Sequence, residues 1–207
     1  MKFVLFVEGK TERALREFLQ SWLNAKLPQR VGIKVVRFEG WRDYYDGIVK
    51  KVELSLSGKS GADVIAAIGL LDLYGPTFYP QDRKTASERY AWGKRHLEGK
   101  VGQPRFRQHF AVHETEAWLL ADPKILPSEV RTALPGRCAK PEEVNFEEPP
   151  AKLLARLYRD NLGKKYKKII DGANLFQALQ PERAAEKCPS LRALLEDMLR
   201  LATGAVS

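Results

Sequence analysis

Two runs of apolar, β-prone residues, at 2–7 and in the segment 63–71, have no polar face. Such runs are typical of strands that are buried on both sides within a parallel sheet. Between them, an amphipathic helical pattern begins at Thr11, a further strand is predicted at 33–38 and a second helix at 42–56. This alternation of strands and helices predicts an α/β fold with a mainly parallel, Rossmann-like sheet flanked by helices.

The second half of the chain has a different pattern. Gly75, Pro76 and Pro80 mark a loop, and the polar segment 83–103 predicts a helical excursion. A last strand is predicted at 106–112, and the remaining residues are mostly helical in pattern. We therefore predict an α/β core at 1–122 with a probable insertion at 75–104, and a helical C-terminal cap at 123–207 that packs on the core.

Composition restricts the class of protein. The 207 residues are 44% hydrophobic and 29% charged, which fits a folded soluble domain. Lys and Arg number 35 against 26 Asp and Glu, a formal net charge of +9 that favours an acidic partner, with nucleic acid first; the alternative is a merely soluble basic surface.

The apolar run at 2–7 stops at Glu8, too early for a signal peptide, and no run is long enough to span a membrane, so we expect a cytoplasmic protein. Two cysteines without paired spacing exclude a Cys-rich zinc site.

The first strand is followed by the sequence Glu-Gly-Lys-Thr-Glu at 8–12. Gly-Lys-Thr is part of the P-loop motif, but Val4 stands where that motif needs its first glycine, so a P-loop is excluded. Glu8 ends the strand at the edge where open α/β sheets bind ligands, and Glu12 follows in the first helical turn. Glu12 alone is slightly better explained by favourable interaction with the helix dipole, worth about 0.3–1 kcal/mol.

A second acid, Asp72, ends the third predicted strand. Carboxyl ends of parallel strands meet at one sheet edge, so Glu8 and Asp72 are expected to share a crevice. Carboxylates held close together need a proton or a cation, and hard oxygen ligands beside a phosphate substrate favour magnesium or manganese. The alternative is that Asp72 is only a solvated strand end.

A cluster of polar residues, His113, Glu114, Thr115 and Glu116, follows the last strand. If this segment stays extended, both glutamates face the same way and can reach one metal ion. If it turns helical at once, His113 and Glu116 share a face instead. A lone histidine of this kind is more often a hydrogen-bonded structural residue than a ligand.

These motifs at 8–12, 72–75 and 113–117, the last ahead of Asp122-Pro123, together resemble an uncharacterised bacterial TOPRIM-like family, the domain of unknown function numbered four thousand two hundred and seventy-six. The segments 149–154, 166–172 and 188–189 are also similar to that family's pattern. The family is distantly similar to the TOPRIM domains of overcoming-lysogenisation-defect nucleases. The resemblance implies a strand-end glutamate as acid/base or ligand and an Asp-x-Asp pair that holds magnesium.

In this sequence Glu8 corresponds to the glutamate and Asp72 to the first aspartate, while Tyr74 stands in the place of the second. Glu114 or Glu116 can supply the missing oxygen, since ligands converge in space and not along one segment. If two ions bind, the resemblance implies that Glu8, Glu12 and Glu116 hold one and Asp72 helps to hold the other. The candidate metal ligands are thus Glu8, Glu12, Asp72, Glu114 and Glu116, the catalytic candidates are Glu8, Asp72 and Lys152, and His113 and Tyr74 are further candidates.

Basic residues are concentrated in two segments. Residues 83–107 hold eight Lys/Arg against two Glu, a net of 8 − 2 = +6, and residues 159–168 hold five against one Asp, a net of 5 − 1 = +4. Aromatic residues are interleaved with both, a mixture that stacks bases beside a tracked backbone, although each ring taken alone is better explained as core. The nucleic-acid-binding candidates are Lys10, Arg83, Lys84, Arg89, Lys94, Arg95, Arg105, Arg107, Lys164, Lys165, Lys167 and Lys168.

We therefore expect a magnesium- or manganese-dependent phosphodiesterase or nuclease that acts on DNA or RNA. The resemblance further implies an ATPase protein partner in a phage-defence system, and a homodimer is compatible with the sequence. The alternative is a catalytically degenerate TOPRIM scaffold that binds nucleic acid or a protein partner without cleaving. Tyr74 in the place of an aspartate favours that alternative.

Overall fold

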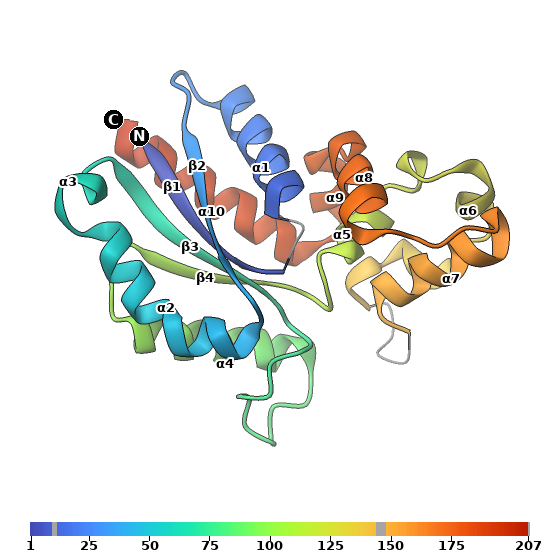
Figure 1. The fold of residues 1–207 in the computed structure, drawn as a ribbon, viewed down its shortest axis with the longest axis horizontal. Helices are drawn as coiled ribbons and strands as arrows, with labels where there is room; N and C mark the ends of the chain where they lie inside the picture. The colour runs from blue at the N-terminus through green and yellow to red at the C-terminus, as the bar shows by residue number, and fades with distance from the viewer. Residues whose placement is uncertain (10–11, 144–147, 207) are drawn as a thin grey trace.

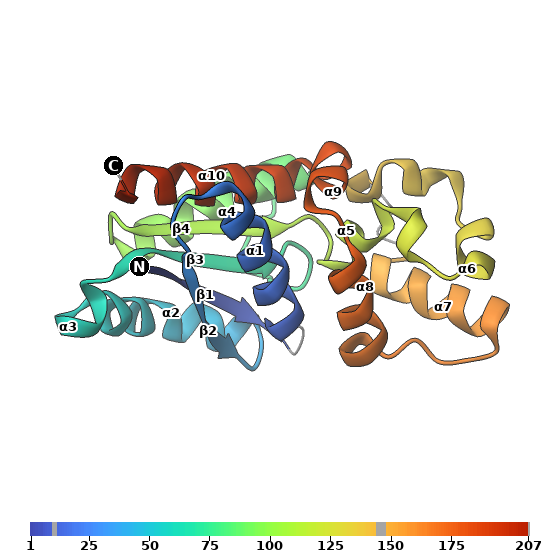
Figure 2. The same ribbon diagram turned by 90° about the horizontal axis from the view of Figure 1, so that it is seen from above.

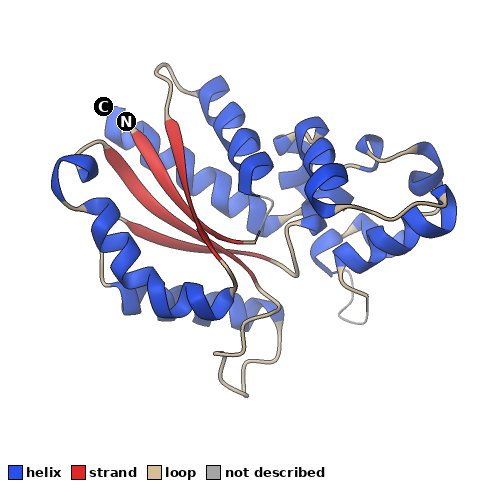
Figure 3. Ribbon diagram, viewed as in Figure 1, coloured by secondary structure: helices blue, strands red, loops and turns tan. Residues whose placement is uncertain are grey.

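Four parallel strands form the centre of the protein (Figures 1 and 3). The computed structural model describes residues 1–9, 12–143 and 148–206, without the side chains of Glu12, Arg13, Ser60 and Val206. The sheet order is β2-β1-β3-β4, and the strands are β1 (Lys2–Glu8), β2 (Gly32–Phe38), β3 (Val64–Asp72) and β4 (Phe106–Ala111). The predicted α/β class with a parallel sheet flanked by helices is confirmed.

The two central strands are buried on both faces, as their apolar sequences predict. Phe3, Leu5 and Val7 of β1 lie in one hydrophobic core, while Val4 and Phe6 lie in a second core on the opposite face. Successive side chains of a strand point to opposite faces, so both faces must be covered by other elements.

Helices cover the two faces of the sheet (Figure 2). On one face lie α1 (Glu12–Lys26) and α10 (Pro189–Val206), which contact each other and the sheet. On the other face lie α2 (Trp41–Leu56) and α4 (Ala86–Val101), with the short α3 (Gly58–Gly61) leading into β3. Thr11, where the first helical pattern was predicted to begin, lies outside the described residues.

The segment between β4 and α10 forms a helical part beyond the carboxyl ends of the strands (Figure 1). Its α-helices are α5 (Glu116–Leu120), α6 (Ser128–Thr132), α7 (Pro150–Leu162), α8 (Ala173–Ala178) and α9 (Pro181–Lys187). Short 3-10 turns lie at Pro123–Ile125, Gly136–Ala139 and Pro141–Glu143, and a π-helical turn at Lys168–Gly172. Fully buried Trp118 belongs to the hydrophobic core that this part shares with α1 and α10.

The predicted division into a core at 1–122 and a cap at 123–207 stays a prediction. By sequence α10 belongs to the predicted cap, yet it packs against β3 and β4. Within the predicted insertion, α4 packs on β4 and buries Leu97 and Val101 in the core of that face. The connection from β3 to β4 is therefore the crossover that a parallel sheet requires, preceded by the loop 73–85.

None of the helices in the described ranges combines the length and the apolar composition needed to cross a membrane.

A buried polar pair joins β4 to α10. His109 is only 2% exposed, and its Nε2 lies 3.1 Å from Oδ2 of Asp197. Burial lowers the pKa of His109, and the Asp197 hydrogen bond opposes this effect only in part. Burial tends to raise the pKa of Asp197, but its hydrogen bonds with His109 and Arg200 outweigh that and lower it to about 2.

Both shifts make the folded protein bind fewer protons than the unfolded chain in acid, so acid destabilises the fold. For His109, the free energy of unfolding falls as the pH drops below about 6.5. For Asp197, it falls as the pH drops from about 4 towards the folded pKa of about 2. We predict that Asp197→Asn lowers the melting temperature at pH 7, and that the difference from the parent shrinks as the pH falls from about 4 towards 2. Calorimetric melting across this range measures it; a difference that does not change with pH would contradict the assignment.

Candidate functional site

Acidic side chains converge beyond the carboxyl ends of the central strands. From β1 the chain passes through α1 to β2 on one side, and from β2 through α2 across to β3 on the other side of β1. Because α1 and α2 cover opposite faces, the connections diverge between β1 and β3, and open α/β sheets form their ligand crevice at the carboxyl ends of such a strand pair. Glu8 is the last residue of β1 and Asp72 the last of β3, as the sequence predicted.

Glu8 is partly buried beside the start of α2. Its carboxylate accepts a hydrogen bond from the backbone N–H of Trp41, the first residue of that helix. Burial raises the pKa of Glu8, while this hydrogen bond and the charge of Lys168 lower it in part. The first-turn N–H groups of α2 therefore help to hold a carboxylate ionised at the sheet edge.

Asp72 has the most strongly perturbed carboxyl group of the site. Its Oδ1 accepts a hydrogen bond of 3.2 Å from the backbone N–H of Thr115. Burial raises the pKa of Asp72 well above its ordinary value; the charge of Lys168 opposes this, and the carboxylates of Glu116, Glu114 and Glu8 add to it. The four acids predicted from three separate motifs are thus close enough to influence one another.

The segment that follows β4 adopts neither of the two conformations considered from sequence. His113 turns the chain sharply with φ 63°, and α5 begins at Glu116. The Nε2 of His113 lies 3.1 Å from the carbonyl oxygen of Glu142, and its ring stacks on Tyr74 with 4.6 Å between centroids. Burial lowers the pKa of His113, which favours the neutral ring. These contacts give His113 and Tyr74 a packing role next to the acids.

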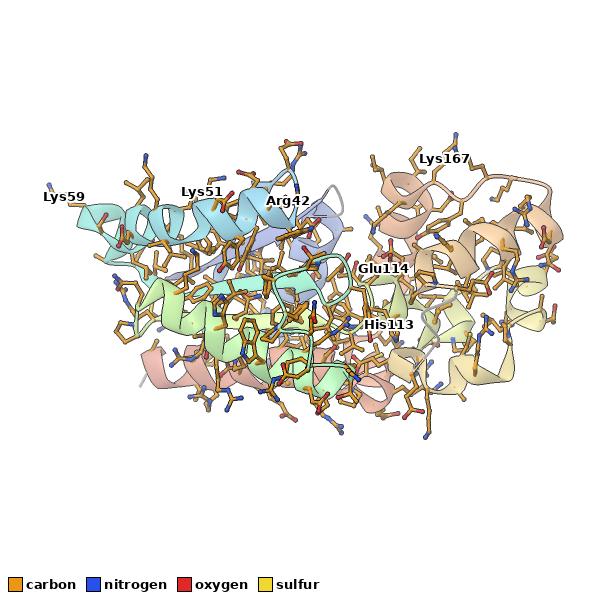
Figure 4. All side chains as sticks on the ribbon, turned by 90° about the horizontal axis from the view of Figure 1, so that it is seen from below. Arg42, Lys51, Lys59, His113, Glu114 and Lys167 are labelled. Atoms are coloured by element: carbon orange, nitrogen blue, oxygen red, sulfur yellow. The ribbon has the colours of Figure 1, made fainter. Side chains whose placement is uncertain are left out.

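Glu114 and Glu116 contact different elements of the helical part. Oε2 of Glu114 accepts a 2.9 Å hydrogen bond from the backbone N–H of Ala151 in the first turn of α7. Burial raises the pKa of Glu114, and this hydrogen bond lowers it in part. Figure 4 shows Glu114 and His113 where the sheet and the helical part meet. The turn after β4 therefore attaches the helical part to the acidic edge.

Glu116 forms an ion pair with Lys168 of the π-helical turn. Its side chain is 1% exposed, and its Oε1 and Oε2 lie 2.9 and 3.1 Å from Nζ of Lys168. Burial opposes the positive charge of Lys168, but the charges of Glu116 and Asp72 outweigh burial and raise the pKa of Lys168. Gly172 allows this turn to pack closely, because a Cβ there would lie 2.8 Å from the hydroxyl of Tyr166.

Lys168 was predicted from sequence as one member of a surface basic cluster. That role stays a prediction, and the structure adds a pairing of Lys168 with Glu116 that had no signal in the sequence. Lys164, Lys165 and Lys167 of the same cluster are exposed on the segment that leads to it. Lys152 is exposed in the first turn of α7, where its charge acts on Glu114.

Several predicted nucleic-acid-binding residues lie far from the acids or are held by the chain itself. Arg105 precedes β4, at the amino edge of the sheet, and donates to the carbonyl oxygens of Leu56, Gly61 and Val64. Arg107 donates to the carbonyls of Pro104 and Phe106. Lys94 contacts the carbonyl of Gln108 and the carboxylate of Glu98.

Other predicted basic residues lie on α4 and the loop before it. Arg89 lies on the rings of Tyr74 and Tyr79, at 5.7 Å from each centroid. Arg83 pairs with Asp82 at 3.4 Å, and Lys84 and Arg95 are exposed. Lys10 lies outside the described residues, as does the side chain of Glu12.

The donor set fits a hard divalent cation in an open site. Carboxylate oxygens are the ligands that magnesium and manganese prefer. Among the described side chains no three Asp, Glu, His or Cys groups are arranged to hold one ion. Magnesium usually binds through one or two carboxylates together with waters and substrate phosphates, so a site for it does not require a cluster of three protein ligands.

A cavity of about 660 Å³ is lined by Val112 and by parts of α4, α9, α10 and the turn at Pro141–Glu143. Its lining residues include Tyr90, Glu142 and Ser190, and none of the four acids. The acidic crevice is therefore a site distinct from this cavity.

Comparisons with known proteins identify one family. The model of the family described as "Domain of unknown function (DUF4276)" matches residues 7–199, a range that includes all four acids and Lys168. Among solved structures, the C-terminal region of the Burkholderia pseudomallei OLD protein is similar at 19% sequence identity and a TM-score of 0.49, over 97% of each chain. No curated protein matches the chain. The family match confirms the resemblance inferred from the sequence motifs.

The ion pair between Glu116 and Lys168 gives a stability prediction. Lys168→Met leaves the buried Glu116 carboxylate without its cation, so the free energy of unfolding should fall by about 1–3 kcal/mol. Lys165→Met removes an exposed lysine from the same segment and should change it by less than about 0.5 kcal/mol. Urea denaturation of both variants measures the effect, and equal stabilities would show that the ion pair is not important for folding.

Proposed function

The chain belongs to the DUF4276 family, and we propose that it is a divalent-metal-dependent phosphodiesterase that cleaves nucleic acid. The observation that carries this proposal is that Glu8 and Asp72 end adjacent strands and that the charges of Glu8, Glu114 and Glu116 act on Asp72 at the carboxyl edge of the sheet. Like charges gathered in a partly buried crevice are costly unless a cation or a proton is bound. Perturbed acids in a crevice are typical of functional sites.

Each residue has a role that follows from its position. Glu8 and Asp72, at the ends of adjacent strands, are proposed to hold the cation together with the substrate phosphate. A bound divalent cation would neutralise phosphate charge and favour ionisation of the attacking water. Glu114 and Glu116 are proposed to add oxygen ligands or to orient water, since both lie beside Asp72.

Lysines of the helical part are proposed to contact phosphate. Nζ of Lys168 has three N–H donors, and its contacts with Glu116 leave capacity for a phosphate oxygen next to the acids. Lys152 and the exposed Lys164, Lys165 and Lys167 lie on the same part of the molecule, and Figure 4 shows Lys167 pointing outward. A basic surface around an acidic centre attracts a polyanion without neutralising the centre.

The polymer is proposed to be DNA or RNA, the ion magnesium or manganese, and the compartment the cytoplasm. An ATPase partner in phage defence, and a homodimer, remain proposals that come from the resemblance and the sequence.

A second candidate function is a non-catalytic nucleic-acid- or protein-binding scaffold. The Glu116–Lys168 ion pair favours it, because a cation of the chain itself already neutralises part of the acidic centre. Tyr74 also favours it, because its ring packs on His113 and supplies no carboxylate.

The first test of the proposed function is cleavage. With magnesium or manganese, the parent should cleave single- or double-stranded DNA or RNA, and Glu8→Gln and Asp72→Asn should lose activity by at least about 100-fold, as expected for groups that act in the transition state. Glu53→Gln on α2 changes an exposed carboxylate and serves as the control. Variants of Glu8 and Asp72 that cleave like the parent would refute the assignment of the site.

A second test separates the two candidate functions by metal binding. A site that binds magnesium stabilises the fold by RT ln(1 + [L]/Kd), or about 2.7 kcal/mol at 100 times Kd. The melting temperature of the parent should therefore rise as magnesium is added, while that of Asp72→Asn should rise much less. If both respond equally little, the scaffold function is favoured and the metal-dependent one rejected.

A further inference from the structure

A group of aromatic side chains between α2, α4 and the loop 73–85 is only partly buried. We call Trp41, Tyr45, Phe78, Tyr79 and Trp92 the aromatic wall; each remains partly exposed, whereas core rings such as Phe6 and Tyr44 of the same face are fully buried. Phe78 is its centre, with ring centroids 5.2 Å from Tyr45, 4.6 Å from Tyr79 and 6.2 Å from Trp92. Three of these rings, Tyr45, Phe78 and Tyr79, also pack against the hydrophobic core of that face, so the wall is the partly exposed margin of the core.

The aromatic wall borders the acidic crevice at two points. At one point, Trp41 contacts Phe78 with 6.1 Å between centroids, and the backbone N–H of Trp41 donates to Glu8. At the other, Tyr79 shares its cation neighbour Arg89 with Tyr74, which follows Asp72 by two residues and stacks on His113. The wall is therefore adjacent to the segments that carry Glu8 and Asp72.

Cations lie against the rings of the wall. Arg42 lies 5.3 Å from the ring of Trp41, Arg89 lies 5.7 Å from that of Tyr79, and Lys100 lies 4.3 Å from that of Tyr45. Arg42 is seen at the end of α2 closest to the helical part in Figure 4. Two acids on the helices that carry the wall already accept hydrogen bonds from the backbone. Asp43 accepts from the N–H of Glu39, and Glu88 accepts from the N–H of Thr85. The wall thus combines aromatic rings with positive charge.

Rings flanked by cations match the chemistry of unpaired nucleotides. Base faces stack on aromatic side chains, and Arg and Lys contact the phosphates between them. In a duplex the faces of the bases are already stacked on each other, so a duplex offers this surface only its phosphates. We propose that the aromatic wall binds the unpaired bases of single-stranded nucleic acid and leads its backbone to the acidic crevice.

This inference rests on the proposed function and adds the substrate class, which is single-stranded nucleic acid or an unpaired segment. It is tested by binding in EDTA, so that no cleavage is needed for the measurement. The probes are a fluorescein-labelled oligothymidine strand and a labelled duplex of the same length, followed by fluorescence anisotropy. The parent should bind the single strand at least about tenfold more tightly than the duplex.

Variants of two wall residues locate the surface. Trp41→Ala and Phe78→Ala should each weaken single-strand binding by about tenfold, equal to about 1.4 kcal/mol, which lies within the range for one stacked base. Leu54→Ala removes a side chain that is 63% exposed on the same helix and should bind like the parent. Circular dichroism checks that each variant is folded.

A conservative variant keeps the test valid if an alanine variant does not fold. Trp41→Phe keeps a ring and should bind within about twofold of the parent. The single strand should quench tryptophan fluorescence in the parent, and a measurable part of this quenching should be lost in Trp41→Phe, while Trp92 of the wall accounts for the rest. Unchanged quenching in that variant would refute stacking on Trp41.

The outcomes separate this inference from the proposed function. If the parent cleaves nucleic acid but binds duplex and single strand equally, or if the alanine variants bind like the parent, the aromatic wall is not the binding surface and the catalytic proposal stands. If the parent binds single strands through the wall but shows no metal-dependent cleavage, the inference on binding holds and the scaffold function replaces catalysis.

Discussion

Burial of both faces of β1 and β3 is the constraint on which the rest of the structure depends. Strands with no polar side cannot lie at a solvated surface, so helices must cover both faces of the sheet. Each connection between parallel strands therefore runs back over one of these faces as a crossover. Parallel strands joined in this way all end at the same edge. The polar residues that follow the strands are therefore collected at that edge, next to helix N-termini that supply N–H donors to Glu8 and Glu114.

The acidic edge is balanced by the helical part and not by the sheet. Lys168 is brought against Glu116, Asp72 and Glu114 from a π-helical turn, and Ala151 donates to Glu114 from α7. These contacts link the helical part to the acids through charge, while the shared apolar core around Trp118 links it through packing. Any change at the crevice therefore affects the junction between the two parts of the molecule.

Local sequence patterns predicted the strands, the crossing helices and the positions of Glu8 and Asp72, because each depends on a few neighbouring residues. They failed at the turn after β4, where His113 adopts a positive φ that neither the extended nor the helical alternative contains. They also grouped basic residues by segment, although Arg105 lies at the opposite sheet edge and is held by three backbone carbonyls. Charge counted along the chain does not record which edge of a sheet a residue occupies.

The sequence by itself determined the α/β class, the family and the edge of the sheet at which acids gather. Hydrophobic periodicity and the order of elements along the chain can be read from short segments, and exposing apolar strand faces to water would cost much free energy. Only the tertiary structure decided which cation meets the acids and which rings border them. Glu116 and Lys168 are 52 residues apart in the chain, and Trp41, Phe78 and Trp92 come from three separate elements. Such contacts depend on how helices pack over the sheet, and no short segment carries that information.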